Sequence, residues 1–182
     1  MNKPLIHWRH FLTALTLGLS IITAQTPTAS GRPAQVQGQG PDAVKIEQLL
    51  RQSGYGYRKL SPGIWIMDAK GESLLTFSIL FAAGDGFLVT GVIVAPKDKM
   101  NVTSEMMFKL MKLNYSLDYV KIGFDKDDDL FVRWEVKTQK LDLPLFKEVI
   151  RRVTDDADEV YRTIQPYLKK PINSFLSYSL TK

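Results

Sequence analysis

The side chains that most often carry out nucleophilic, acid–base or metal chemistry are scarce in this sequence of 182 residues. It has no cysteine and only two histidines, His7 and His10, both within the first ten residues. A chain without cysteine forms no disulfide and carries no cysteine-linked lipid, and a Ser/His/Asp, Cys/His or zinc site needs imidazole or thiol groups. Carboxylates and hydroxyls are therefore the remaining candidates for chemistry over most of the chain.

The two histidines lie in a segment with the pattern of an export signal. Residues 1–10 carry Lys3 and Arg9 and no acid, and residues 11–23 are uncharged and rich in Leu, Ile and Ala. A helix of this length rises about 20 Å, less than the ~30 Å hydrocarbon core of a bilayer, which favours a signal peptide over a lasting membrane span. We predict cleavage after Ala24 and a periplasmic or secreted protein. An uncleaved anchor would leave the domain on the same side of the membrane.

The charge balance does not favour a nucleic-acid partner. Removal of the leader lowers the formal net charge from +5 to +3, and the lysines are not interleaved with aromatic residues or Gly/Arg repeats. We therefore predict no nucleic-acid partner, and membrane contact only through the leader during export.

The composition divides the chain into four parts. Residues 25–41 are rich in Pro, Gly, Gln, Thr and Ser, and such a segment cannot bury enough apolar surface to fold. The predicted organisation is a signal peptide at 1–24, a disordered linker at 25–41, a folded domain at 42–170 and a C-terminal tail at 171–182. The pattern of the tail, at 172–180, fits either a short extra strand or a helical extension.

Hydrophobic periodicity predicts that the folded part is an α+β domain. Asp42 is the predicted N-cap of a first helix that ends at Gly54, and Thr103 or Asn101 is the N-cap of the second. Asp142 is the predicted N-cap of a long third helix that Pro166 ends or kinks. The predicted order is α-β-β-β-α-β-β-α, with an antiparallel sheet of about five strands at 55–68, 72–82, 86–95, 118–125 and 130–136.

In both of the last two predicted strands the apolar residues stand at even positions. Directly opposed residues lie on the same face of a sheet, so the residue numbers of each opposed pair must add up to an even number. A three-residue loop at 127–129 satisfies this condition and places Lys121 opposite Glu135. It also predicts a left-handed backbone at Asp129. The odd positions of this hairpin form a predicted polar face with Tyr119, Lys121, Phe131, Arg133 and Glu135.

Two acidic clusters invite a functional interpretation. Residues 125–129 carry carboxylates at alternate positions, as the start of an EF-hand does, but Leu130 and Val136 stand where that motif requires Gly and Glu. A solvated turn is favoured, and weak calcium binding stays open.

The second cluster is the run at 155–159. Arg151 with Asp155, Arg152 with Asp156, and Asp158 with Arg162 are each four residues apart, which is the spacing of ion pairs on a solvated helix face. We predict no catalytic residue, no cofactor and no metal.

Methionine is concentrated in the second predicted helix. Four of the six methionines are Met100, Met106, Met107 and Met111. Together with Phe108 and Leu110 they cover too wide an arc for one buried stripe. Methionine fills gaps in cores and also suits adaptable interfaces, so a core role and an interface role both stay open.

The segments LMKLNYSLDYVKIGFDKDDDLFVRWEV (110–136) and LDLPLFKEVIRRVTDDADEVY (141–161), together with the element order, resemble the YbjN family. That family is described as bacterial sensory transduction regulators and is similar in fold to type III secretion chaperones. The likeness covers about residues 42–169. It implies a sheet flanked by helices that dimerises and binds protein segments without catalysis.

In that fold the middle helix commonly contributes to the dimer interface. The resemblance therefore implies an interface role for Met106, Met107 and Met111. On the predicted polar face of the hairpin, Tyr119, Phe131 and Arg133 are candidates for contacts with a partner.

Three functions compete at this point. The first is an exported, non-enzymatic protein-binding or regulatory module that acts as a homodimer with a protein partner. The second is a periplasmic carrier of a small apolar or lipidic ligand. The third is a hydrolase that uses carboxylates alone, which would need two carboxyl groups held across a cleft.

Overall fold

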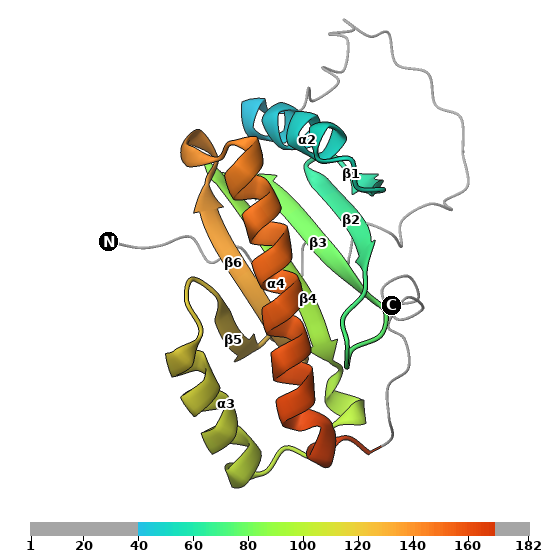
Figure 1. Ribbon diagram of the computed structural model, residues 1–182, viewed down its shortest axis with the longest axis vertical. Helices are drawn as coiled ribbons and strands as arrows, with labels where there is room; N and C mark the ends of the chain where they lie inside the picture. The colour runs from blue at the N-terminus through green and yellow to red at the C-terminus, as the bar shows by residue number, and fades with distance from the viewer. Residues whose placement is uncertain (1–39, 170–182) are drawn as a thin grey trace, which may run out of the picture. The chain divides into compact units, whose positions relative to one another are not determined.

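A six-stranded antiparallel sheet packed on a long helix organises residues 40–169, the part of the chain that the computed structural model describes (Figure 1). The strand order is β1-β2-β3-β4-β6-β5. The predicted α+β class is confirmed. The elements are α2 (Pro41–Ser53), β1 (Arg58–Ser61), β2 (Ile64–Ala69), β3 (Phe77–Gly84), β4 (Phe87–Ala95), η2 (Lys97–Lys99), α3 (Ser104–Ser116), β5 (Lys121–Phe124), β6 (Leu130–Lys137), η3 (Thr138–Lys140), α4 (Leu143–Ile164) and η4 (Gln165–Tyr167).

The sheet has one more strand than the sequence predicted, because the first predicted strand folds back on itself. Residues between Ser61 and Ile64 form the turn that joins β1 to β2. Gly63 has a φ of 76°, and a Cβ there would lie 3.0 Å from the carbonyl oxygen of Ala83. Pro62 and Gly63 therefore form a hairpin turn within the predicted strand 55–68.

The turn between β3 and β4 agrees with the sequence. Gly84 pairs with Phe87, which leaves Asp85 and Gly86 as a two-residue turn with φ values of 53° and 80°. Two left-handed residues in a row match the right-handed twist of the flanking strands, and Asp and Gly tolerate this conformation best.

The predicted strand 72–82 begins late, at Phe77, because a buried carboxylate on α4 holds the preceding residues in a loop. The Ser73 and Leu74 N–H groups both donate to Asp158 Oδ1 at 2.8 Å. A Cβ at Gly71 would lie 2.3 Å from the same oxygen, so the loop passes close to α4 at a glycine. Leu74 is fully buried, and its neighbour Leu75 is exposed.

The helix ends follow the sequence signals. Gly54, with a φ of 81°, ends α2, and the Thr103 side chain accepts from the Met106 N–H at the start of α3. The Asp142 side chain caps α4 by accepting from the Leu145 N–H at 2.8 Å. The helix then ends at Ile164, two residues before Pro166. Side-chain caps satisfy backbone donors that a helix leaves without a partner.

The predicted N-cap at Asp42 is wrong. The first helix begins one residue earlier, at Pro41, whose fixed φ suits the first turn. The Asp42 carboxylate instead accepts from the Gly86 N–H at 2.9 Å and from the Thr138 hydroxyl. It therefore ties α2 to the β3–β4 turn and to η3.

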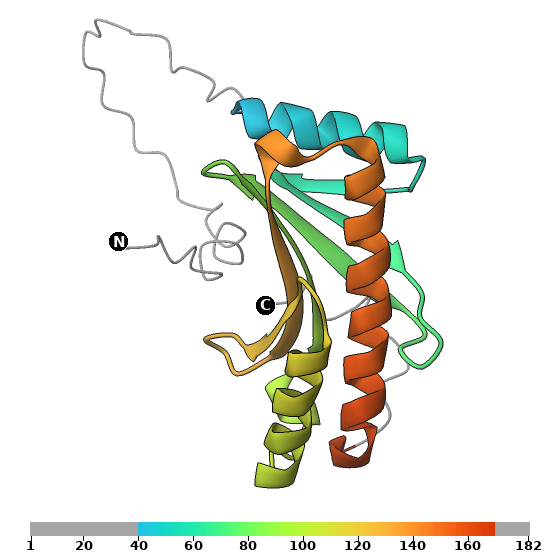
Figure 2. The same cartoon turned by 60° about the vertical axis from the view of Figure 1, so that its left-hand side comes forward.

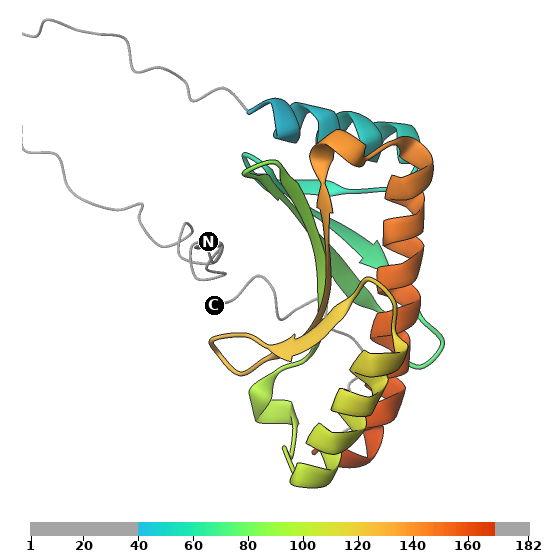
Figure 3. The same cartoon turned by 90° about the vertical axis from the view of Figure 1, so that its left-hand side faces the viewer.

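One face of the sheet carries the core. Helix α4 lies along this face, α2 lies across one end, and α3 lies beside α4 near β5 (Figures 1 and 2). The Phe81 and Phe146 rings, from β3 and α4, have centroids 5.7 Å apart. No described helix lies over the opposite face of the sheet (Figure 3). The largest fully buried side chains include Trp65, Phe77, Phe81, Phe146, Ile46 and Leu50.

Two of the three predicted ion pairs on the last helix are present. Arg151 Nη1 lies 2.8 Å from Asp155 Oδ2, and Arg162 Nη2 lies 3.3 Å from Asp158 Oδ2. The Asp158 side chain is nevertheless only 7% exposed, so it does not belong to a solvated face as predicted. Its contact with the loop before β3 explains why it is buried.

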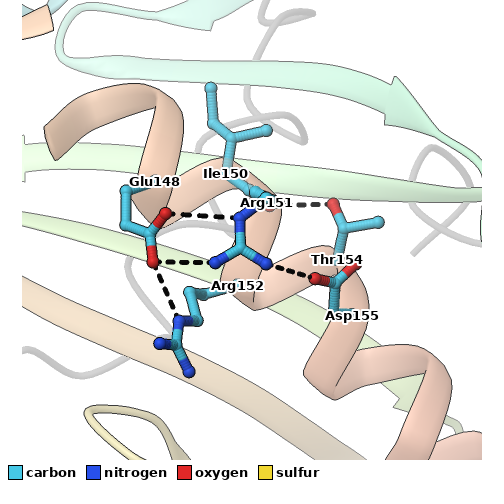
Figure 4. A network of polar contacts seen from close by, with 6 residues as sticks. All are labelled: Glu148, Ile150, Arg151, Arg152, Thr154 and Asp155. Carbon is cyan, nitrogen blue, oxygen red and sulfur yellow. Dashed lines mark hydrogen bonds and ion pairs between the residues drawn. The ribbon is translucent and has the colours of Figure 1, made fainter. Parts of the chain in front are cut away.

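The third predicted pair, Arg152 with Asp156, does not form. Arg152 Nε donates to Glu148 Oε1 at 2.9 Å, and the same carboxylate accepts from Arg151 (Figure 4). Two cations therefore share Glu148, and Asp156 is buried.

Replacing Asp158 by alanine is expected to lower the free energy of unfolding by about 2–3 kcal/mol. The substitution leaves two N–H groups of the loop before β3 without their charged acceptor. Urea denaturation of both proteins would measure the difference. Asp155→Ala is the matched control on the same helix: its carboxylate is 57% exposed, and its loss is expected to cost less than about 1 kcal/mol. Equal losses for the two variants would contradict this role of Asp158.

Candidate interaction surface

Helix α3 has two apolar faces, and only one of them packs on the domain. Met106 and Leu110 are buried in the core, whereas Phe108, Met111 and Tyr115 are 59%, 69% and 93% exposed. Apolar side chains that cluster on an exposed helix face mark a surface suited to another protein. The outer face of α3 is therefore the candidate interaction surface.

The structure divides the methionine cluster between the two roles that the sequence left open. Met100 and Met106 are buried in the core, Met107 is 36% exposed, and Met111 points outward. Of the three methionines predicted for the interface, Met107 and Met111 lie on the candidate surface. Met106 fills the core beneath it.

Sequence reasoning did not assign Phe108 and Tyr115 to the surface. The positions 108, 111 and 115 are spaced three and four apart, so they form a second helical stripe beside the buried one. This spacing is the sequence signal that indicates a second apolar face on the helix.

A shallow pocket separates α3 from β5, which lies at one end of the strand order. Asn114 Oδ1 accepts from the Ile122 N–H at 3.0 Å and so joins the end of the helix to the strand. The pocket volume of about 110 Å³ is small beside the ~300–1,000 Å³ of typical small-molecule sites. The residues that line it are Met107, Leu110, Met111, Asn114, Ile122, Gly123, Phe124 and Leu130.

Charged groups border the candidate surface. Glu105 and Lys109 form an ion pair at 3.0 Å, and the Lys109 ammonium lies 5.4 Å from the centre of the Tyr167 ring. The hydrogen bond from Lys109 lowers the pKa of Glu105, and hydrogen bonds to Tyr167 and Glu105 raise the pKa of Lys109. The Lys112 ammonium lies 4.6 Å from the Phe108 ring, so the aromatic side chain has a cationic neighbour.

Of the five residues predicted to share the polar face of the last hairpin, Tyr119 lies on the opposite side of the sheet from the other four. Tyr119 has a φ of 68° and stacks on Trp134, with ring centroids 5.0 Å apart. Trp134 belongs to the core face. The left-handed residue breaks the alternation that placed Tyr119 with the odd positions, so Tyr119 lies apart from Phe131 and Arg133.

Phe131 and Arg133 lie together on the other face of the sheet. The Phe131 side chain is buried, and its ring covers Gly123 so closely that a Cβ there would be 3.0 Å from Phe131 Cζ. The Arg133 guanidinium lies 5.2 Å from the ring centre. The outward Phe131 is therefore a packed residue of this face.

The predicted register of this hairpin is wrong by two residues. Lys121 lies opposite Arg133, the loop spans residues 125–129, and the left-handed residue is Asp128. The cause is Asp125, whose carboxylate accepts from the Asp127 and Asp129 N–H groups at 2.9 and 3.0 Å. This side chain organises a five-residue loop in place of the predicted three-residue loop.

The acidic loop also contacts η2. Asp129 Oδ1 accepts from the Lys97 N–H at 2.8 Å, and the Lys97 ammonium pairs with Asp128. The hydrogen bond to Asp128 raises the pKa of Lys97. Within residues 40–169 no group of three or more histidine, aspartate or glutamate side chains could hold a metal ion. None of the helices in this part of the chain is long and apolar enough to cross a bilayer.

Helix α4 carries a buried carboxylate besides that of Asp158. Asp156 is 8% exposed, and its Oδ2 accepts no hydrogen bond from the described residues. Burial raises the pKa of Asp156 to about 6, against the opposing charge of Arg152. Asp118, which follows α3, contributes to the same rise in pKa.

A family model matches most of the described domain. The family is YbjN, with the description "Putative bacterial sensory transduction regulator", and the match spans residues 42–166. No curated protein sequence matches the chain.

Several solved structures have a similar fold at low sequence identity. YbjN from E. coli is 15% identical, with a TM-score of 0.54 over 71% of this chain and 97% of that one. A chain of the heterodimeric ExoU–SpcU complex of the Pseudomonas aeruginosa type III secretion system is 15% identical, with a TM-score of 0.50 over 66% and 98%. A chain of the ExsC–ExsE complex is 16% identical, with a TM-score of 0.49 over 67% and 95%.

The pH dependence of stability is expected to contain a contribution from Asp156. Its pKa is near 3.9 in an unfolded chain, so between about pH 4 and pH 6 the folded protein binds more protons. The free energy of unfolding should therefore fall as pH rises through this window. Asp156→Asn is expected to remove about 2–3 kcal/mol of this fall, as measured by urea denaturation at pH values below and above the window.

The control is Glu159→Gln, which removes a carboxylate that is 41% exposed on the same helix and should leave the pH dependence as it is in the wild-type protein. An unchanged pH dependence in Asp156→Asn would contradict the prediction.

Proposed function

The chain belongs to the YbjN family, and on this basis we propose that it is a non-enzymatic regulatory module that binds a protein partner and dimerises through the outer face of α3. The family match covers nearly all of the described domain. The family description points to regulation, and the candidate interaction surface supplies a means of binding.

The exposed apolar stripe on α3 is the observation that carries this proposal. Phe108, Met111 and Tyr115 extend along the helix on the side away from the core, and Met107 joins them at the pocket beside β5. Removing such side chains from water is the main favourable contribution to protein association. The methionines can adjust their rotamers to a partner, and the aromatic residues supply large contact areas.

A similar fold occurs in a protein complex. The ExoU–SpcU structure is described as a heterodimer, which supports the proposal that a fold of this kind presents surfaces to another protein. For the present chain we propose that such a surface binds an unidentified protein partner.

The chemistry of the domain supports a role without catalysis. Residues 42–166 contain neither histidine nor cysteine. Among the carboxylates, Asp42 and Asp158 serve as acceptors for backbone N–H groups, and Glu148 is shared by two arginines. These acids are engaged in holding the fold together.

We also propose export to the periplasm or beyond. The signal peptide predicted for residues 1–24 lies outside the described residues, so the proposal depends on the charge and hydropathy pattern of the sequence. Intact-mass measurement of the protein from a bacterial envelope fraction would test it. A mature chain that begins at Gln25 is expected, and a cytoplasmic protein that keeps residues 1–24 would contradict the proposal.

Replacing Met111 by aspartate is expected to weaken dimerisation at least about tenfold, a loss of ~1.4 kcal/mol, because it places a charge in the apolar interface. Light scattering over a micromolar concentration series would measure the dissociation constant. Val44→Asp is the matched control, since Val44 is 54% exposed on α2, away from the candidate surface. A monomeric wild-type protein, or an unchanged constant in Met111→Asp, would contradict the proposed dimer.

Capture of a partner is tested with a second substitution on the same helix face. The wild-type protein, immobilised and exposed to envelope extract, is expected to retain a protein that Tyr115→Asp retains poorly and Val44→Asp retains fully. Equal retention by all three would place partner binding away from α3.

A further inference from the structure

The face of the sheet that α4 does not cover is also apolar. Residues 66 and 80 are paired in the sheet, and residue 82 is paired with residue 89, so side chains from three strands share this outer face. Strand alternation places it opposite the core residues Trp65 and Phe81. The apolar members of the outer face are Ile64, Ile66, Leu80, Ala82, Val89 and Ile93.

An apolar face of this width needs a cover, because an antiparallel sheet with one solvated side has polar residues at alternate positions. Here Leu80, Val89 and Ile93 stand where such polar residues would occur. Among the described residues no helix or strand lies over them (Figure 3). The outer face is thus distinct from the candidate interaction surface on α3.

The described part of the chain ends beside residues 99–101, which follow β4. The Asn101 N–H donates to the Tyr167 carbonyl at 2.8 Å, and the Lys169 N–H donates to the Lys99 carbonyl at 2.9 Å. Met100 and Leu168 form an antiparallel bridge. Residues 167–169 therefore run back towards the end of β4, whose Val89 and Ile93 belong to the outer face.

The residues that follow have a strand pattern. The segment 170–182 reads KPINSFLSYSLTK, with Leu176, Tyr178 and Leu180 separated by serines. This alternation gives an extended chain one apolar side and one polar side. Thirteen extended residues span about 43 Å, more than the ~30 Å length of a nine-residue strand such as β4.

We propose that the C-terminal segment 170–182 packs on the outer face of the sheet, with Leu176, Tyr178 and Leu180 against the apolar side chains of β2, β3 and β4. Of the other segments outside the domain, the leader at 1–24 is proposed to be removed on export, and residues 25–39, rich in Gln, Gly and Pro, lack such a stripe. The chain thus covers this face itself and leaves α3 for other proteins.

Two full-length variants with equal charge test which side of the segment is buried. Leu176→Asp/Tyr178→Asp places two carboxylates on the apolar side, and Ser177→Asp/Ser179→Asp places two on the polar side. The first should raise the fluorescence of the dye ANS at least about threefold, because the outer face becomes accessible, and the second should leave it unchanged. Circular dichroism of both variants would show that the domain stays folded.

Cross-linking tests the contact directly, since a chain without cysteine permits clean introduction of pairs. Val89→Cys/Tyr178→Cys should form an intramolecular disulfide at least about tenfold faster than Lys147→Cys/Tyr178→Cys. Lys147 is exposed on α4, on the other side of the domain.

Several results would overturn the proposal. Equal ANS fluorescence in the two aspartate variants, or equal cross-linking of the two cysteine pairs, would remove the segment from the outer face. Disulfides that form only between chains would identify a second copy as the cover. The measurements are made on monomer at low concentration, so they do not depend on the proposed dimer.

Discussion

The structure depends on the burial of α4 against one face of the sheet. Residues along the whole length of this helix are fully buried, among them Phe146, Val153, Val160 and Ile164. Helix α4 follows all six strands along the chain and packs on the core face that they form. It also supplies Asp158, which holds the loop before β3. The hydrophobic contact and the polar anchor thus come from the same element.

Covering one face of the sheet with α4 has a consequence for the rest of the surface. Helix α3 reaches the core only through its inner stripe, which includes Met106 and Leu110, so its outer stripe stays exposed. No described helix covers the second face of the sheet. The domain therefore has two apolar surfaces, and the proposals assign one to other proteins and one to its own C-terminal segment.

Much of the fold could be predicted because its signals are local. The caps at Thr103 and Asp142, the Asp85-Gly86 turn and the period of α4 each depend on residues within one or two turns of chain. The candidate surface was predicted in part. Met107 and Met111 lie there, but the same pattern also selected Met106, because a wide apolar arc does not reveal which part of it faces the core.

The sequence by itself determined the α+β class, the order of the elements apart from the division of the first strand, and the lack of imidazole and thiol groups in the domain. Only the tertiary structure decided the roles of Asp42 and Asp158, whose partners lie more than forty residues away. It also decided that Tyr119 stacks on the core side of the sheet. The physical reason is that periodicity and capping act along the chain, whereas a buried carboxylate or a stacked ring depends on partners that only folding brings near.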